Sequence, residues 1–160
     1  MTAQGRVTGL QRSAGGVPKL PVDRVMVRAT GMEGDRQRDR RFHGGPDRAL
    51  CLYSQERLDA LAAEGHPVSP GALGENVTIF GLPWDDVRPG ARLRIGAVEA
   101  QVTAFASPCR NIVAGFLDGA ITRVGQKVNP GWSRVYVRVL SEGLITVGDP
   151  VTLHSVHAES

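Results

Sequence analysis

Cys109 is the side chain best placed to do chemistry in this chain. It follows Pro108 and precedes Arg110, where we expect one strand to end and a short helix, residues 111–119, to begin. A reactive thiolate needs an exposed, electropositive position near a chain reversal or a helix N-terminus, and this setting provides both. The residues leave one alternative open, in which Cys109 is a half-buried structural cysteine.

The other cysteine and most of the histidines offer Cys109 no partner for a metal site. Cys51 lies within the apolar run of residues 49–53, which indicates packing, and three of the four histidines fall in a predicted loop and in the tail. No zinc-binding spacing is present. Two cysteines in 160 residues do not make a disulfide framework, and the start has no signal-peptide hydrophobic region. We therefore expect a cytoplasmic protein.

The segment of residues 35–48 is dense in arginine, aspartate and glycine. Gly44 and Gly45 would let the backbone approach a ligand and present its N–H groups, while His43 and the arginines could bind an anion. The alternative is a solvated turn held by local Asp–Arg pairs. The candidate ligand-binding residues of this segment are Arg36, Arg38, Arg41, His43, Gly44, Gly45, Asp47 and Arg48.

A second glycine-rich loop, residues 71–75, leads into a predicted strand at residues 76–80. Glu75 and Asn76 could place a carboxylate and an amide into a pocket at this point. The alternative is an ordinary β-turn, in which Gly and Asn are expected residues.

Many short strands with regular Gly and Pro turns predict a mainly β fold with a few helices attached. Alternating apolar residues and the turn at Gly96 predict a hairpin over residues 92–104. Further strands are expected at residues 7–10, 25–29, 49–53, 134–139, 144–147 and 151–153. The strand at residues 144–147 would return along the molecule after a turn at residues 142–143. Such a pattern is typical of a closed or nearly closed β-barrel.

One α-helix is expected directly after the strand of residues 49–53. Ser54 would cap its N-terminus, and Leu58, Leu61 and Ala62 would form its buried stripe. Gly65 would end the helix.

Taken together, these segments resemble the MOSC domain, a family named for the C-terminal domain of molybdenum cofactor sulfurase. The resemblance is to small stand-alone bacterial members and covers about residues 25–153 of a single domain, residues 1–160. The matching segments are Gly34-Asp35-Arg36-Gln37, His43-Gly44-Gly45-Pro46-Asp47-Arg48-Ala49, Gly74-Glu75-Asn76, Ser107-Pro108-Cys109, Gly131-Trp132 leading to Arg138-Val139-Leu140, and Gly148-Asp149.

The resemblance implies a β-barrel like that of pyruvate kinase, and it identifies Cys109 with the hallmark cysteine of the family. That cysteine is thought to ligate the molybdenum of the pterin cofactor or to carry a persulfide. The mitochondrial amidoxime-reducing component and some small bacterial members are similar in reducing N-hydroxylated compounds. The resemblance thus implies a catalytic, molybdenum-binding Cys109 and cofactor contacts from Arg36, Arg38, Arg41, His43, Gly44, Gly45, Asp47, Arg48, Glu75, Asn76 and Arg110.

The residue chemistry agrees with this implication, since a soft thiolate suits molybdenum and arginines suit the phosphate of the cofactor. The family also has an association with pyridoxal phosphate. The alternative function is that of a sulfur carrier, in which Cys109 holds a persulfide for the assembly of a metal–sulfur cofactor.

The expected partners follow from these two functions. They are a small N-hydroxylated substrate with a separate reductase, or a sulfur acceptor with a desulfurase. Because the chain lacks the N-terminal β-barrel region of the amidoxime reducers and the desulfurase domain of the sulfurases, a partner or a homodimer is expected to complete the pocket.

Nucleic acids and membranes are not expected as partners. The net charge is +3, but aromatic residues make up only 5% of the chain, and no aromatic–basic cluster offers a stacking platform for bases. No apolar run is long enough to cross a bilayer.

Overall fold

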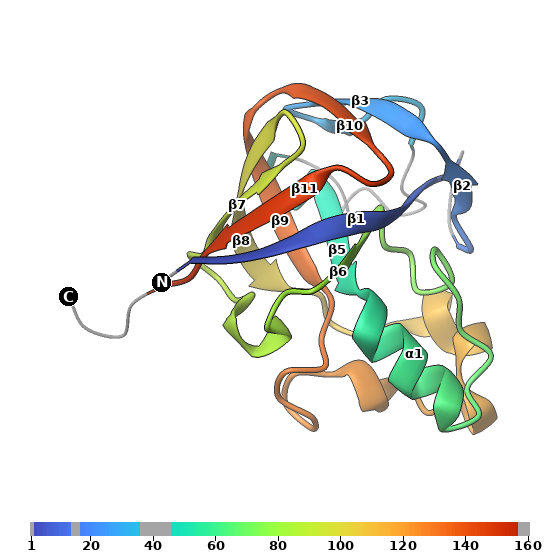
Figure 1. The fold of residues 1–160 in the computed structure, drawn as a ribbon. Helices are drawn as coiled ribbons and strands as arrows, with labels where there is room; N and C mark the ends of the chain where they lie inside the picture. Colours follow the sequence, from blue (N-terminus) through green and yellow to red (C-terminus); the bar gives the residue numbers. More distant parts are fainter. Residues whose placement is uncertain (1, 14–16, 36–45, 157–160) are drawn as a thin grey trace.

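The computed structural model describes residues 2–13, 17–35 and 46–156, and its main sheet closes into a barrel. The strands follow one another around the barrel in the order β11-β7-β8-β9-β5-β6-β1, and antiparallel pairing of β1 with β11 closes the ring (Figure 1). The predicted β-barrel is therefore confirmed. The barrel strands are β1 (Thr2–Arg12), β5 (Leu50–Ser54), β6 (Val77–Phe80), β7 (Arg92–Ile95), β8 (Val98–Phe105), β9 (Val135–Ser141) and β11 (Pro150–His154). A short strand, β2 (Leu20–Val22), pairs with the end of β1.

A second, three-stranded sheet lies across one end of the barrel (Figure 1). It contains β3 (Arg24–Arg28), β4 (Gly31–Met32) and β10 (Gly143–Thr146). The chain turns after β9 as expected, but β10 pairs with β3. The reason is that both edges of β9 are already occupied, one by β8 and the other by β5.

Helix α1 (Gln55–Ala63) lies at the opposite end of the barrel from this sheet (Figure 1). The Ser54 hydroxyl caps it by accepting a hydrogen bond of 3.1 Å from the Arg57 N–H. Leu58 and Leu61 are buried, whereas Ala62 is exposed, so the buried stripe is narrower than predicted. The helix ends at Ala63, and Gly65, with a φ of +100°, follows its C-cap Glu64. No helix in the described ranges is long and apolar enough to span a membrane.

The remaining helices of the described chain are short turns of 3-10 type. The helix predicted over residues 111–119 is divided in two, because Phe116 adopts an extended conformation with φ −130° and ψ 142°. These turns are η1 (Pro46–Arg48), η2 (Trp84–Asp86), η3 (Arg110–Gly115), η4 (Leu117–Gly119) and η5 (Ile121–Val124).

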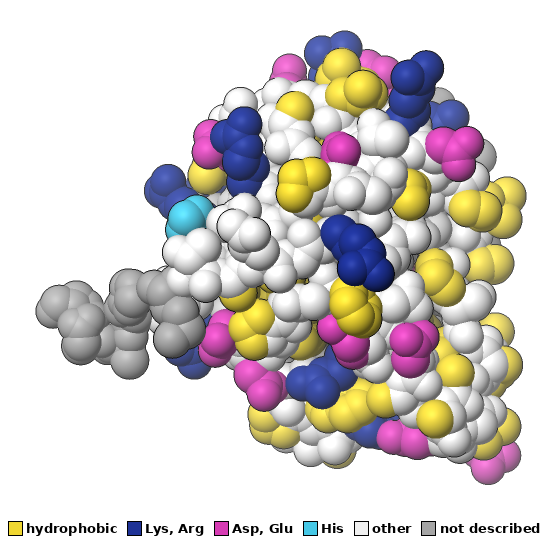
Figure 2. Space-filling model, in the orientation of Figure 1, with side chains coloured by type: hydrophobic (Ala, Val, Ile, Leu, Met, Phe, Trp, Pro, Cys, Tyr) yellow, Lys and Arg dark blue, Asp and Glu magenta, His cyan; other side chains and the backbone are white. Residues whose placement is uncertain are grey.

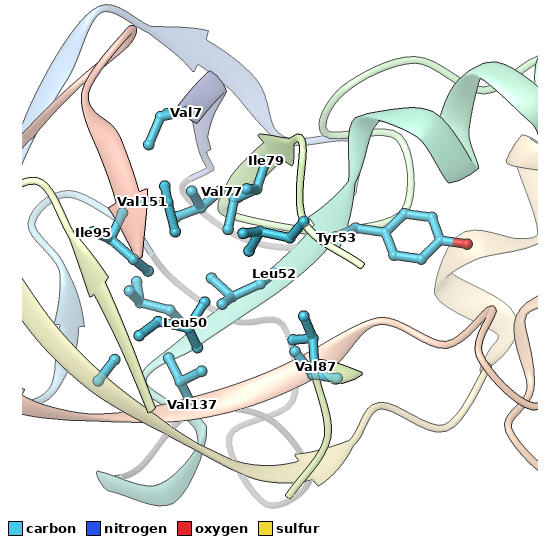
Figure 3. Close-up of a cluster of buried hydrophobic side chains, with 14 of the residues drawn as sticks. Val7, Leu50, Leu52, Tyr53, Val77, Ile79, Val87, Ile95, Val137 and Val151 are labelled. Atoms are coloured by element: carbon cyan, nitrogen blue, oxygen red, sulfur yellow. The ribbon is translucent and has the colours of Figure 1, made fainter. Parts of the chain in front are cut away.

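The core fills the barrel with aliphatic side chains from every wall (Figure 3). Strand β5 is buried along its whole length, because it lies between β9 and β6 and is covered on its outer side as well. Leu50, Leu52 and Tyr53 all belong to the hydrophobic cluster, and the ring of Tyr53 points away from the aliphatic side chains at its centre (Figure 3). The Tyr53 hydroxyl donates to the carbonyl of Trp132 at 2.7 Å and so joins the barrel to the loop that precedes β9.

The surface carries no broad region of one charge on the face shown in Figure 2. Basic and acidic side chains alternate there, with hydrophobic side chains between them. Such mixing is usual for a protein surface that keeps a small net charge.

The loop that precedes β6 folds around the buried carboxylate of Glu75. The N–H of Leu73 donates to this carboxylate at 3.3 Å, and the Thr78 hydroxyl lies 3.5 Å from it. Burial raises the pKa of Glu75 to about 7, although hydrogen bonds from loop N–H groups partly oppose the rise. Glu75 therefore holds the loop in place and is only partly ionised near pH 7.

Replacement of Ser54 by alanine should remove the helix cap and leave the Arg57 N–H without its partner. We expect the free energy of unfolding to fall by about 1 kcal/mol. Urea denaturation followed by circular dichroism measures this change. Ser54→Asp should retain most of the stability, since aspartate also caps; equal losses in both variants would contradict a capping role.

Glu75 should make the folded state less stable as the pH rises. The unfolded chain releases this proton near pH 4.5, whereas the folded state keeps it until about pH 7. The contribution of Glu75 to the free energy of unfolding is therefore fully present below pH 4.5. It is lost as the pH rises towards 7, by roughly 3 kcal/mol if no other group compensates.

Urea midpoints at pH 5 and pH 8 test this expectation. The wild type should lose more stability between the two than Glu75→Gln, and the exposed-site control Glu99→Gln should follow the wild type. Parallel curves for the wild type and Glu75→Gln would contradict it.

Candidate functional site

A polar pocket opens beside β5, where this strand lies between β9 and the loop that leads into β6. Cys51 on β5 faces Tyr136 on β9 as its register partner. The pocket has a volume of about 40 Å³, room for a few water-sized groups. Its lining residues are Lys19, Arg48, Cys51, Gly74, Asn76, Arg134 and Tyr136. Three of the seven are cationic, so the pocket favours an anion.

Arg134 is the most deeply buried of these cations, with 3% of its surface exposed. Its guanidinium donates to the Leu73 carbonyl at 2.9 Å and to the Ser107 carbonyl at 3.1 Å, with a longer contact of 3.4 Å to Ala106. Its buried Nε has no hydrogen-bond partner among the residues that the structure describes. A buried donor without an acceptor is costly, which makes the Nε–H of Arg134 a candidate donor to a ligand oxygen.

Lys19 is buried as well, but its charge is balanced. Its ammonium lies 2.7 Å and 2.8 Å from the two carboxylate oxygens of Asp35. Asn76 holds this carboxylate from the other side, donating to it at 3.0 Å through its amide nitrogen, while the Asn76 amide oxygen accepts from the N–H of Cys51 at 3.0 Å. Arg48 and Arg134 therefore carry the excess positive charge of the pocket.

Arg48 covers the ring of Tyr136, with its guanidinium 5.2 Å from the ring centre. Burial raises the pKa of the Tyr136 phenol, and the nearby Cys51 and Cys109 raise it further. Burial also raises the pKa of the Cys51 thiol to about 11. Both groups therefore keep their protons at neutral pH, and Cys51 is a packing residue as the sequence indicated.

Cys109 lies at the edge of this group of residues and is partly exposed. It occupies the N-cap position of η3, and its effect on the pKa of Tyr136 puts its sulfur within electrostatic reach of that ring. Because η3 is a six-residue 3-10 turn, the longer helix expected to favour the thiolate is not present. Arg110 is exposed at the first position of η3.

The structure brings three of the sequence candidates together around Tyr136, namely Arg48, Asn76 and Cys109. Glu75 lies behind them, buried in its loop, and is not part of the pocket lining. Asp47 is on the surface, 3.7 Å from the guanidinium of Arg138. The candidates Arg36, Arg38, Arg41, His43, Gly44 and Gly45 lie outside the described residues.

Sequence reasoning missed Lys19, Arg134 and Tyr136. The alternation of residues 134–139 puts Arg134 and Tyr136 on the strand face opposite the valines, and nothing in that pattern indicates that they are buried. The available signal was Tyr136 itself, since an aromatic residue between two arginines on one face suggests that something covers that face. Lys19 had no comparable signal, because only the fold brings it to Asp35.

Comparisons with known proteins agree with this architecture. Residues 39–152 match the family model of the MOSC domain. The chain is 34% identical to the uncharacterized protein YflK of Bacillus subtilis strain 168 over 142 residues, and 34% identical to protein YiiM of Escherichia coli strain K12 over 146 residues. These alignments cover 88% and 87% of this chain but only 63% of each relative, so the chain spans less than two thirds of their length.

Solved structures resemble this chain over nearly its full length. YiiM from Geobacillus stearothermophilus superposes with a TM-score of 0.72 at 26% identity, covering 97% of this chain and 77% of that one. YuaD from Bacillus subtilis superposes with a TM-score of 0.75, covering 98% of this chain and 99% of that one. At 18% identity the YuaD match supports the fold alone. With the family model matching most of its length, the chain belongs to the MOSC domain family.

Proposed function

We propose that this protein binds the molybdenum cofactor, with Cys109 as a ligand of the metal, and reduces N-hydroxylated small molecules. One observation carries the proposal: a partly exposed cysteine stands near a small cationic pocket whose buried arginine has an N–H with no partner among the described residues. Membership of the MOSC family supplies the class of cofactor.

The pocket fits the phosphate of the cofactor. At about 40 Å³ it has room for a phosphate-sized group and not for a pterin ring system. The free N–H of Arg134 and the guanidinium of Arg48 supply charge-assisted donors, which phosphate oxygens accept with short, strong hydrogen bonds. Lys19 adds a third cation, already fixed by Asp35.

The cysteine fits the metal. A thiolate is a soft ligand that suits molybdenum, and the sulfur of Cys109 is accessible where that of Cys51 is sealed. When bound, the cofactor would supply the two-electron chemistry that removes oxygen from an N–OH group. The electrons would come from a separate reductase.

The other residues of the site would have supporting roles. Tyr136 keeps its proton and its ring supports Arg48, so the cationic side chain is held in place before a ligand arrives. Asn76 fixes Asp35 and hence Lys19. The arrangement is preorganised for an anion, which lowers the entropic cost of binding one.

The second candidate function is that of a sulfur carrier. A persulfide on Cys109 needs an exposed sulfur and nearby positive charge, and Cys109 does not itself belong to the pocket lining. In this case molybdenum need not bind. The two functions differ in what the purified protein carries.

Replacement of Cys109 by serine should decide between them. If Cys109 ligates the metal, freshly purified wild type contains molybdenum and Cys109→Ser loses at least about nine tenths of it, since one soft ligand is removed. If Cys109 carries sulfur, cyanide releases thiocyanate from the wild type without molybdenum. Mass spectrometry supplies an internal control: iodoacetamide should label Cys109 in the folded protein and leave buried Cys51 unlabelled. Molybdenum retained by Cys109→Ser would contradict the first function.

Loss of one pocket cation should weaken cofactor retention. Arg48→Gln removes a charge-assisted donor, and we expect the molybdenum and pterin content to fall about tenfold or more, as for a loss of roughly 1.5–3 kcal/mol. The matched control is Arg92→Gln, at an exposed arginine of β7. Equal molybdenum contents in the two variants, measured by elemental analysis, would show that the polar pocket does not hold the cofactor.

A further inference from the structure

An apolar hollow lies on the far side of the segment that leads to Cys109. It is bounded by the end of β8 and by the chain that follows η5, and its volume is about 490 Å³. Its lining residues are Phe105, Ala106, Ser107, Pro108, Thr122, Gly125, Gln126, Lys127 and Val128. Lys127 is the one charged residue in this lining, and no carboxylate belongs to it among the described residues.

Residues 106–108 line the apolar hollow and are joined to the polar pocket through Arg134, which belongs to the lining of that pocket. On the pocket side, the carbonyls of Ala106 and Ser107 accept hydrogen bonds from Arg134. On the other side, Phe105 and Pro108 line the hollow. Cys109 follows Pro108 directly in the chain and so comes just after the segment that lines the hollow, although it belongs to the lining of neither space.

The opposite side of the hollow is held in place by helix α1. Arg123 in η5 lies over the ring of Trp132, 3.8 Å from its centre, and binds the carboxylate of Glu64 at 2.9 Å and 2.6 Å. Gly125 lets the two sides of the hollow approach closely: a Cβ there would lie 3.3 Å from Cγ of Pro108. Since φ at Gly125 is −90°, the backbone does not require glycine, and the close approach explains its presence.

We propose that this hollow binds the uncharged, apolar organic group of the N-hydroxylated substrate. The inference rests on the proposed function, because it takes Cys109 as the centre of the reaction. The hollow has the size of a small-molecule site and mostly apolar walls. A neutral ring buries apolar surface there, whereas a cation would meet Lys127 without a carboxylate to balance it.

This preference distinguishes substrate from product. An amidoxime takes up two electrons and two protons, the N–O bond breaks, and an amidine and one water are formed, with the electrons supplied by the separate reductase. The amidine then takes a third proton from water and becomes a cation. The hollow therefore holds the neutral substrate and releases the charged product.

Binding of benzamidoxime to the cofactor-free protein tests the inference directly. Amide chemical shifts in nitrogen-15 NMR should change for residues of the hollow, and benzamidine should bind at least about tenfold more weakly, a difference of 1.4 kcal/mol. Val128, which is 61% exposed, is a site where a substitution does not disturb the core. Val128→Glu should lower the affinity for benzamidoxime about tenfold and raise the affinity for benzamidine.

Val147→Glu is the matched control, because Val147 is an exposed valine after β10 that does not belong to the hollow. It should bind both compounds as the wild type does. Benzamidine binding as tightly as benzamidoxime, shifts confined to other surfaces, or a Val128→Glu variant with wild-type affinities would each overturn the inference.

The same experiment separates this inference from the proposed function. Benzamidoxime bound in the hollow of a protein that never acquires molybdenum would support the hollow and refute the molybdenum-dependent reduction. A loaded enzyme that reduces benzamidoxime equally well as wild type and as Val128→Glu would support the reduction and refute the hollow.

Discussion

The buried guanidinium of Arg134 is the interaction on which the site depends. It bonds the carbonyl of Leu73 in the loop before β6 and those of Ala106 and Ser107 in the segment after β8. One side chain thus fixes the loop that carries Glu75 and the segment that leads to Cys109. Without it, buried carbonyls from two segments would lose their donors, a penalty that exceeds the gain from any single hydrogen bond. The barrel supplies the walls, and Arg134 sets the distance between the loops that rise from them.

The segment from Ala106 to Cys109 separates two environments of opposite character. On one side is the polar pocket, where Arg48 and Arg134 favour an anion. On the other is the apolar hollow, which suits a neutral organic group. Cys109 follows this segment in the chain. Under the proposed function, the cofactor phosphate and the organic substrate would occupy separate spaces, which gives the two ligands separate requirements for binding.

Much of the fold could be predicted because its signals are local. Alternating apolar residues predict the β7–β8 hairpin, and the serine at position 54, directly before the helical segment, predicts the N-cap of α1. The partner of β10 could not be predicted, since it depends on which strand edges remain open after the barrel has closed. The helix after Cys109 was expected from composition, but Phe116 turns away from helical geometry to pack into the core.

The site was only partly predictable for a related reason. Cys109, Arg48 and Asn76 stood out because their neighbours in sequence are unusual. Arg134 did not, since an arginine at the start of a strand is ordinary until the surrounding loops bury it. Lys19 becomes part of the pocket only through Asp35, sixteen positions along the chain. Burial and pairing of charges are properties of the folded chain, so they escape a pattern in the sequence.

A crystal structure of the protein purified with its cofactor tests the central claim most directly. The account predicts molybdenum bound to the sulfur of Cys109. It also predicts a phosphate group in the polar pocket that accepts a hydrogen bond from the Nε–H of Arg134. A cofactor bound elsewhere on the barrel, with that N–H still lacking an acceptor and the sulfur free of metal, would contradict it.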